Sequence, residues 1–144
     1  MTTERTSRPL AKIFNAIGAV LFALFAWLQR EDDNVEIYVN PSKIDVALWI
    51  GFYGLVAALF VLAIFRRFPR WLYLAVLALG VFHLVTTIPG VIDNFKGGSI
   101  EMAKESMSAE RPEVELSREF FGVLVAFVGA WLAWRQRPKA AQAD

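Results

Sequence analysis

Four long apolar runs constrain this chain more than any other feature. They are separated by polar or charged segments and cover Leu10–Leu28, Ile44–Phe65, Trp71–Ile88 and Phe120–Trp134. A helix that crosses the hydrocarbon core needs about 20 mostly apolar residues, because each residue rises about 1.5 Å. The last run reaches this length when the turn from Pro112 is included. Backbone amides find no water in a bilayer, so we expect each run to be a helix.

This spacing predicts an all-α protein, an integral membrane four-helix antiparallel bundle. The transmembrane domain covers residues 10–136, with helices at about 10–28, 44–65, 71–88 and 113–134. Residues 29–43 and 89–112 form the two outer loops, and residues 1–9 and 137–144 form the tails. Pro9 and Pro112 suit a first helical turn, where the missing N–H costs nothing. Ser42 and Asp45 have the spacing of a capping box.

The charge distribution predicts how the chain threads through the membrane. The side that holds both termini and the Arg66–Arg70 turn carries nine basic and two acidic residues. The opposite side carries six basic and twelve acidic residues. Basic loops stay in the cytoplasm, so we expect cytoplasmic N and C termini and an acidic outer face. The expected location is the cell (inner) membrane.

The composition excludes several kinds of site. The chain has no cysteine and one histidine, His83. Disulfides, iron–sulfur clusters and zinc–thiolate sites are therefore excluded, and so is a haem held by two histidines of one chain. A net charge of +1 gives no basic excess of the kind that binds nucleic acid. The expected partner is the lipid bilayer, with another membrane protein as an open alternative.

Polar groups near the outer helix ends are the best candidates for chemistry. His83 is expected in the outer half of the third helix, where an ionisable side chain is costly and is a candidate functional residue. Asp45 begins the second helix, Glu119 begins the fourth, and Asp32 follows the first. An imidazole with two or three carboxylates suits a divalent cation or a proton relay. The alternative for His83 is one structural hydrogen bond inside the bundle.

The outer loops hold two further features. Oxygen-bearing side chains that suit a hard cation gather around Asp32, although the glycine and spacing of an EF-hand loop are missing; they are Gln29, Glu31, Asp33 and Asn34. A solvated acidic turn is the alternative. In the second outer loop, Ile100, Ala103 and Met107 recur at helical spacing and predict a short amphipathic helix.

Packing inside a bilayer depends on small residues, because lipid removes the hydrophobic drive between helices. The candidate packing positions are Gly54, Ala58, Gly122, Ala126 and Ala130. The same stripes suit contact with a partner protein. Asn15, inside the first run, is expected to make a helix–helix hydrogen bond. Aromatic residues near helix ends predict a belt at headgroup level; they include Trp27, Trp49, Trp71, Trp131, Trp134, Tyr53 and Tyr73.

Two stretches resemble the transmembrane protein 220 family of small multi-pass proteins. Residues 26–34, from Ala-Trp-Leu-Gln into Glu-Asp-Asp-Asn, resemble the family's Gln-x-Asn-Asp-Pro-Asp stretch, although Glu31 replaces its Asn and Asp33 its Pro. Glu119-Phe120-Phe121-Gly122 resembles its Glu-x-x-Gly. The likeness covers most of residues 10–134 and matches Gln29, Asp32 and Glu119 to family positions. It implies a multi-pass membrane fold and carries no activity with it.

Three functions fit these features. The favoured one is a non-enzymatic accessory or scaffolding subunit whose acidic outer face contacts a partner or a cation. The second is a metal-dependent membrane enzyme or proton-relay protein built on His83, Asp32, Asp45 and Glu119. The third is a haem or pigment binder with His83 as the sole axial ligand. The second requires these side chains to converge, and the third requires a cavity beside His83.

Overall fold

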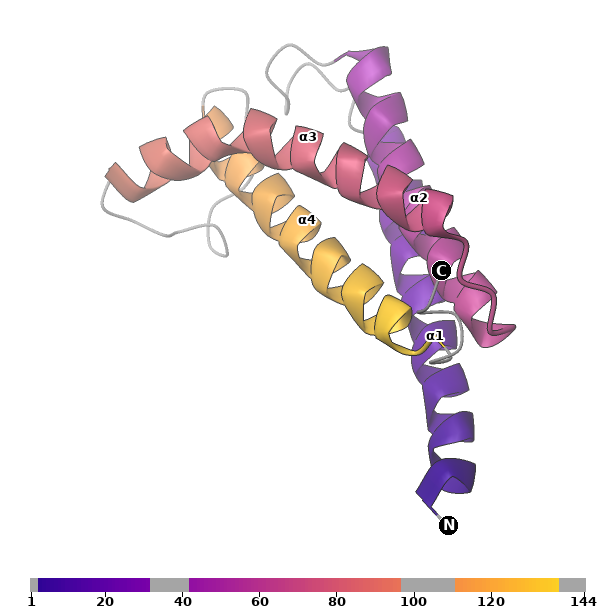
Figure 1. The fold of residues 1–144 in the computed structure, drawn as a ribbon. Coiled ribbons are helices and arrows are strands. Elements are labelled where there is room, and N and C mark those ends of the chain that lie inside the picture. Colours follow the sequence, from indigo (N-terminus) through magenta and orange to yellow (C-terminus); the bar gives the residue numbers. More distant parts are fainter. Residues whose placement is uncertain (1–2, 32–41, 97–110, 138–144) are drawn as a thin grey trace.

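The computed structural model describes residues 3–31, 42–96 and 111–137, in which the regular structure is entirely helical (Figure 1). Four helices, each long and apolar enough to cross a membrane, follow one another along the chain and confirm the all-α membrane fold. They are α1 (Thr3–Leu28), α2 (Lys43–Ile64), α3 (Arg70–Lys96) and α4 (Pro112–Arg135), with the short 3-10 helix η1 (Gln29–Glu31) after α1.

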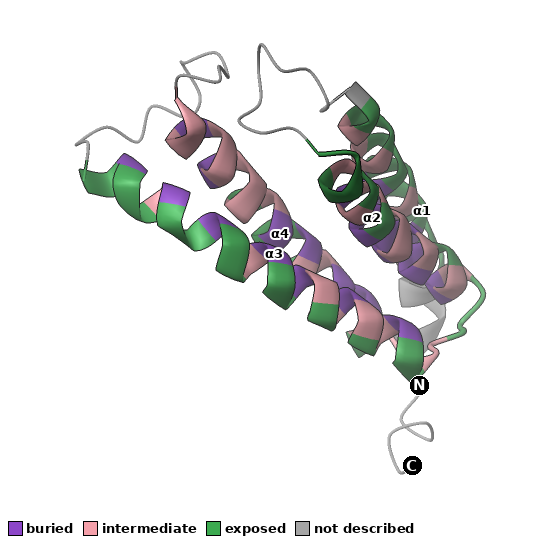
Figure 2. Ribbon diagram, turned by 90° about the horizontal axis from the view of Figure 1, so that it is seen from above, coloured by how far each residue is buried: buried purple, intermediate pink, exposed green. Residues whose placement is uncertain are grey.

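The four helices form two antiparallel hairpins, α1 with α2 and α3 with α4. Most helix–helix contacts lie within each hairpin, and fewer join one hairpin to the other. The hairpins approach each other near the α2–α3 turn and diverge toward the N-terminal ends of α2 and α4 (Figures 1 and 2). We call the end with residues 65–73 and 134–137 the closed end. The end with residues 43–47, 84–96 and 111–121 is the open end.

The α2–α3 turn reverses the chain through a Schellman motif. The Arg66 N–H donates to the Ala63 carbonyl at 3.0 Å, and the Arg67 N–H donates to the Leu62 carbonyl at 2.9 Å. These bonds satisfy the last carbonyls of α2. Arg66 has φ 58°, the left-handed conformation that this motif requires and that glycine usually supplies. Pro69 follows, and α3 begins at Arg70.

The helix bounds agree with the sequence for α2 and α4 and differ for α1 and α3. Residues 3–9 of the expected tail are helical, because α1 begins at Thr3 and contains Pro9, and the membrane-spanning stretch of α1, Pro9–Leu28, agrees with the expected helix at 10–28. The expected end of the third helix at Ile88 is wrong, because α3 passes through Pro89 and continues to Lys96. Packing of Gly90 and Asn94 against α4 offsets the hydrogen bond that proline removes. The expected amphipathic helix around residues 100–107 lies outside the described residues.

Ser42 is the N-cap of α2, and its hydroxyl accepts from the Ile44 N–H at 3.2 Å. This cap fixes where the apolar run becomes helical. Asp45 follows in the first turn, where the helix dipole favours a negative charge. Both residues of the expected capping box therefore lie at the start of α2. Of the two hydrogen bonds that define a capping box, the described structure contains the one accepted by the Ser42 side chain.

The core consists of aromatic rings from α1 and α2 on one side and of small residues from α4 on the other. Rings from α1 and α2 stack on one another, with Phe22 and Phe60 at 5.7 Å and Trp49 and Tyr53 at 5.8 Å between centroids. These rings pack against buried small residues of α4. Trp49 and Tyr53, two of the rings expected in the aromatic belt, are buried, because their face of α2 turns toward the other helices.

Candidate functional site

Among the described histidine, acidic and basic side chains, only His83 is buried, with 1% of its surface exposed. Its ring stacks on Trp49 of α2, with centroids 3.8 Å apart and planes inclined by 23°. Phe52 and Phe82 each lie 5.4 Å from it between centroids. The imidazole therefore joins α3 to α2 through ring contacts, at the contact between the two hairpins.

The ring nitrogen Nε2 of His83 has no hydrogen-bond partner in the part of the chain that the structure describes. A buried polar atom left without a partner costs about 1–3 kcal/mol, so each instance calls for an explanation. The expected structural hydrogen bond inside the bundle is thus not formed by Nε2. The imidazole lies against the Leu48 backbone of α2.

The expected metal ligands lie on separate elements. Asp45 is exposed one helical turn before Trp49, and Glu119 is half-buried on α4 with an interaction of its own. Asp32 lies outside the described residues. Within residues 3–31, 42–96 and 111–137, no three histidine, aspartate or glutamate side chains come together as a metal site. A cation centre built on His83 therefore depends on Asp32 and remains a proposal.

The polar outer motif begins in η1. Gln29 and Glu31 belong to this short helix, and Gln29 is half-buried. The Arg30 guanidinium between them lies over the Trp27 ring, 4.4 Å from its centroid. Such a contact fixes a cation beside a headgroup-level aromatic ring. Asp33 and Asn34 lie outside the described residues.

The small residues of α4 carry the contact between the hairpins. Ala126 and Ala130 are fully buried, and a Cβ added at Gly122 would fall on the Tyr53 hydroxyl. Gly129, one heptad further along α4, lies under the rings of Phe22 and Phe60. The absent side chains allow aromatic rings of the first hairpin to rest on the α4 backbone.

The expected packing role does not hold for Gly54 within this chain. A Cβ at Gly54 would meet nothing within 4 Å, and the same is true of Gly51 one turn earlier. Ala58 is half-buried and touches the edge of the core. The reason is the direction of the α2 core face, which Trp49, Tyr53 and Phe60 define on the side away from these small residues.

Asn15 makes the hydrogen bond to another helix that was expected of it, and a second hydrogen bond joins the same two amide groups. Its Nδ2 donates to Oε1 of Gln136 at 2.8 Å, and Nε2 of Gln136 donates to Oδ1 of Asn15 at 3.0 Å. Asn15 is 1% exposed, so the reciprocal pair satisfies an amide within the bundle. The partner could not be predicted, because Gln136 follows the last apolar residue and belongs to no helical pattern in the sequence.

A second polar contact lies near the open end, within the second hairpin. Nδ2 of Asn94 donates to the Ser117 hydroxyl at 3.1 Å, and that hydroxyl donates to the Glu113 carbonyl at 2.6 Å. Both side chains are buried. This contact was not predicted, because Asn94 was expected in the outer loop 89–112. The spacing of Thr87, Gly90 and Asn94 along one helical face is the signal that identifies it.

Comparison with known proteins gives one match. A family model described as "Transmembrane family 220, helix" matches residues 21–135, a range that includes His83, Glu119 and all of α2. No curated protein and no solved structure matches the chain. The match covers most of the chain, so it bears on the whole four-helix domain.

Proposed function

This chain belongs to transmembrane family 220, and we propose that it serves as a non-enzymatic accessory or scaffolding subunit of the cell (inner) membrane. In this proposal both termini lie in the cytoplasm and the open end forms an acidic outer face. The partner is another membrane protein or a cation at that face. The proposal goes beyond the membrane location and the family, which the spans and the family match establish.

The observation that carries the proposal is the use of the buried polar side chains. Asn15 pairs with Gln136, and Asn94 pairs with Ser117, so these groups join helices to each other. The Thr87 hydroxyl donates to the His83 carbonyl within its own helix at 2.8 Å. Polar groups in a catalytic site face a shared space, whereas these groups are used in fixing the helices.

A face of α2 suits the partner. Ala47, Gly51, Gly54 and Ala58 recur at spacings of four, three and four, on the side of α2 opposite its buried rings. Ala47 and Gly51 are exposed, and neither glycine has a close neighbour. Small residues let the backbone of a second transmembrane helix approach closely. The proposal therefore places a partner helix on this face.

The absence of native cysteine makes this face testable with single cysteines. Gly51→Cys, labelled with a photo-activated crosslinker in native membranes, is expected to form one discrete adduct. Val85→Cys, which is 64% exposed on α3, is the control and is expected to form none. A Gly51→Leu variant should then lose the same partner in co-purification while Val85→Leu keeps it. Equal adducts from both positions would contradict the proposal.

A second candidate function follows from the unpartnered Nε2 of His83. A haem or pigment iron, a cation or a relayed proton each needs a ring nitrogen that accepts, as a neutral imidazole provides. Purified wild-type protein would then show visible absorbance or bound metal that His83→Phe lacks. Identical spectra and identical metal content in the two proteins would remove His83 as a ligand.

A further inference from the structure

Besides Arg70, which has an interaction of its own, the closed end carries four arginines that the fold gathers from two places in the chain. Arg66 and Arg67 lie in the α2–α3 turn, and Arg135 and Arg137 lie at the end of α4. The start of α3 is held against the end of α4 by the Tyr73–Trp134 stack, whose centroids lie 4.5 Å apart. We call these four arginines the basic collar.

The basic collar has no carboxylate paired with it among the described residues. The ion pairs Lys96–Asp93 and Arg111–Glu113 both lie at the open end. Like charges gathered without counter-charges repel one another, so the collar favours an anionic ligand.

Aromatic rings position two of the guanidinium groups. Arg135 lies over the Trp131 ring at 4.8 Å from its centroid, and Arg137 lies over Trp134 at 4.3 Å. A ring face attracts the cation without neutralising it or occupying its N–H donors. The donors at the guanidinium edge therefore stay available to an oxygen-rich anion.

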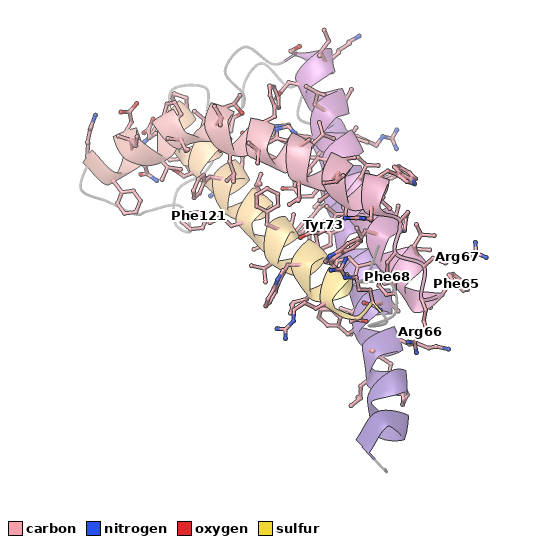
Figure 3. The ribbon with its side chains drawn as sticks, viewed as in Figure 1. Phe65, Arg66, Arg67, Phe68, Tyr73 and Phe121 are labelled. Carbon is pink, nitrogen blue, oxygen red and sulfur yellow. The ribbon has the colours of Figure 1, made fainter. Side chains whose placement is uncertain are left out.

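The backbone of Arg66 gives an independent indication. It occupies the left-handed position of the Schellman motif, where a Cβ is disfavoured and glycine fits without strain. A strained non-glycine residue points to a use for its side chain. The Arg66 side chain is exposed, and Figure 3 shows it extending from the turn with Phe65 and Arg67, while Phe68 and Tyr73 lie back toward α4.

Exposed aromatic rings beside the basic collar indicate that the collar lies at the depth of the lipid headgroups. Phe65 is 68% exposed and Trp71 is 67% exposed, although both are large and apolar. Aromatic side chains at helix ends lie at the level of the lipid headgroups, and arginines beside them reach the phosphates. A soluble acidic partner would leave these rings in water, whereas a lipid surface covers them.

We propose that the basic collar binds the phosphate groups of anionic phospholipids in the leaflet around the closed end. Guanidinium groups form paired hydrogen bonds with phosphate oxygens, which an ammonium group does not match in geometry. Because the α2–α3 turn and the end of α4 each supply two arginines, one bound headgroup region connects the two hairpins. This binding is independent of whether the chain acts as a scaffold.

The test uses the full-length protein in phosphatidylcholine nanodiscs that contain increasing phosphatidylglycerol. Native mass spectrometry measures how strongly phosphatidylglycerol is retained over phosphatidylcholine. Each arginine near an anionic surface contributes about a factor of five, so Arg66→Gln with Arg67→Gln should reduce the preference about 25-fold. Lys96→Gln with Arg111→Gln removes the same charge at the open end, where Asp93 and Glu113 already pair with these cations, and should change the preference less than twofold.

A second variant separates ligand binding from folding. Arg66→Gly relieves the left-handed strain, so its melting temperature in pure phosphatidylcholine should equal or exceed that of the wild type. Its preference for phosphatidylglycerol should nevertheless fall about fivefold, because one guanidinium is lost. A preserved preference in this variant would show that Arg66 binds no lipid and would overturn the proposal.

Two further outcomes would overturn the proposal. If the control pair at the open end loses as much preference for phosphatidylglycerol, the effect depends on the total charge of the protein and not on the basic collar. Displacement of phosphatidylglycerol by millimolar inorganic phosphate, in an uncharged detergent, would show a site for soluble phosphate instead of lipid. Retention of lipid under those conditions, with loss only in the collar variants, supports the assignment.

Discussion

The closed and open ends of the molecule are built from different contacts. At the closed end, the Asn15–Gln136 pair connects α1 directly to the end of α4, so it joins one hairpin to the other. At the open end, the Asn94–Ser117 hydrogen bond joins α3 to α4 within one hairpin. Beyond His83, α3 continues from Leu84 to Lys96, about 20 Å of helix at about 1.5 Å per residue.

The difference shows that the two hairpins are separate packing units connected mainly at one end. Polar groups and aromatic stacks hold the closed end, while Gly90 and Asn94, in the part of α3 beyond His83, contact Leu116 and Ser117 of α4. A substitution at the closed end should therefore change how the hairpins hold each other. A substitution at the open end should change only the second hairpin.

The largest expected effect comes from adding one methyl group at the open end. In Gly90→Ala, the new Cβ would overlap the Leu116 Cβ, which is fixed to the α4 backbone and cannot rotate away. Such overpacking costs about 1–3 kcal/mol. The free energy of unfolding should fall by that amount in titrations with sodium dodecyl sulfate in mixed micelles.

The matched control is Gly51→Ala on α2, where a Cβ meets nothing within 4 Å. Replacing a helical glycine by alanine gains up to about 1 kcal/mol of helix propensity. The same chemical change should therefore stabilise one position and destabilise the other. If both variants gain stability, the α3–α4 contact at the open end is looser than the structure shows.

The next effect concerns the amide pair that closes the other end. A double-mutant cycle with Asn15→Ala and Gln136→Ala isolates its two hydrogen bonds. Such bonds inside membrane proteins average about 0.6 kcal/mol each, so the coupling energy should be about 1 kcal/mol. A coupling near zero would mean that water or lipid headgroups replace the pair, and that the rings of the core alone hold the hairpins together.

A smaller coupling is expected between Asn94 and Ser117, because one hydrogen bond joins them. The cycle with Asn94→Ala and Ser117→Ala should give about 0.6 kcal/mol. Comparing the two cycles sharpens the contrast between the ends. A larger coupling here than for Asn15 and Gln136 would reverse the assignment of the closed end as the stronger connection.

The sequence was sufficient for the parts of the fold that depend on the bilayer. The length and hydrophobicity of each run predicted four helices, and the cost of a buried amide predicted a partner for Asn15. It was insufficient where one helix meets another. Trp49 is a belt residue by position and a core residue by packing, because helix rotation is set by neighbours and not by the apolar pattern.

The same reason explains the errors at Gly54 and Pro89. A small residue permits close approach without specifying which helix approaches, so Gly54 could be assigned to the core or to a partner. Proline is a helix stop by local propensity, yet contacts of Gly90 and Asn94 with α4 extend α3 past it. The candidate site shares this limit, since the stacking of His83 on Trp49 depends on how α2 and α3 are rotated.

The expected change whose sign matters most is that of His83→Phe, between the two ends. A phenyl ring keeps the stack on Trp49 and removes the unpartnered Nε2, whose burial costs about 1–3 kcal/mol in a comparable setting. The variant should therefore be as stable as the wild type or more stable by up to about 1 kcal/mol. His83→Ala is the control, because it removes the ring and should destabilise by opening a cavity.

A loss of stability in His83→Phe as large as in His83→Ala would mean that Nε2 has a partner, such as a bound cation or water, and that the imidazole stabilises the junction of the hairpins through that partner. A stable His83→Phe protein would instead leave function as the reason for a histidine at this position.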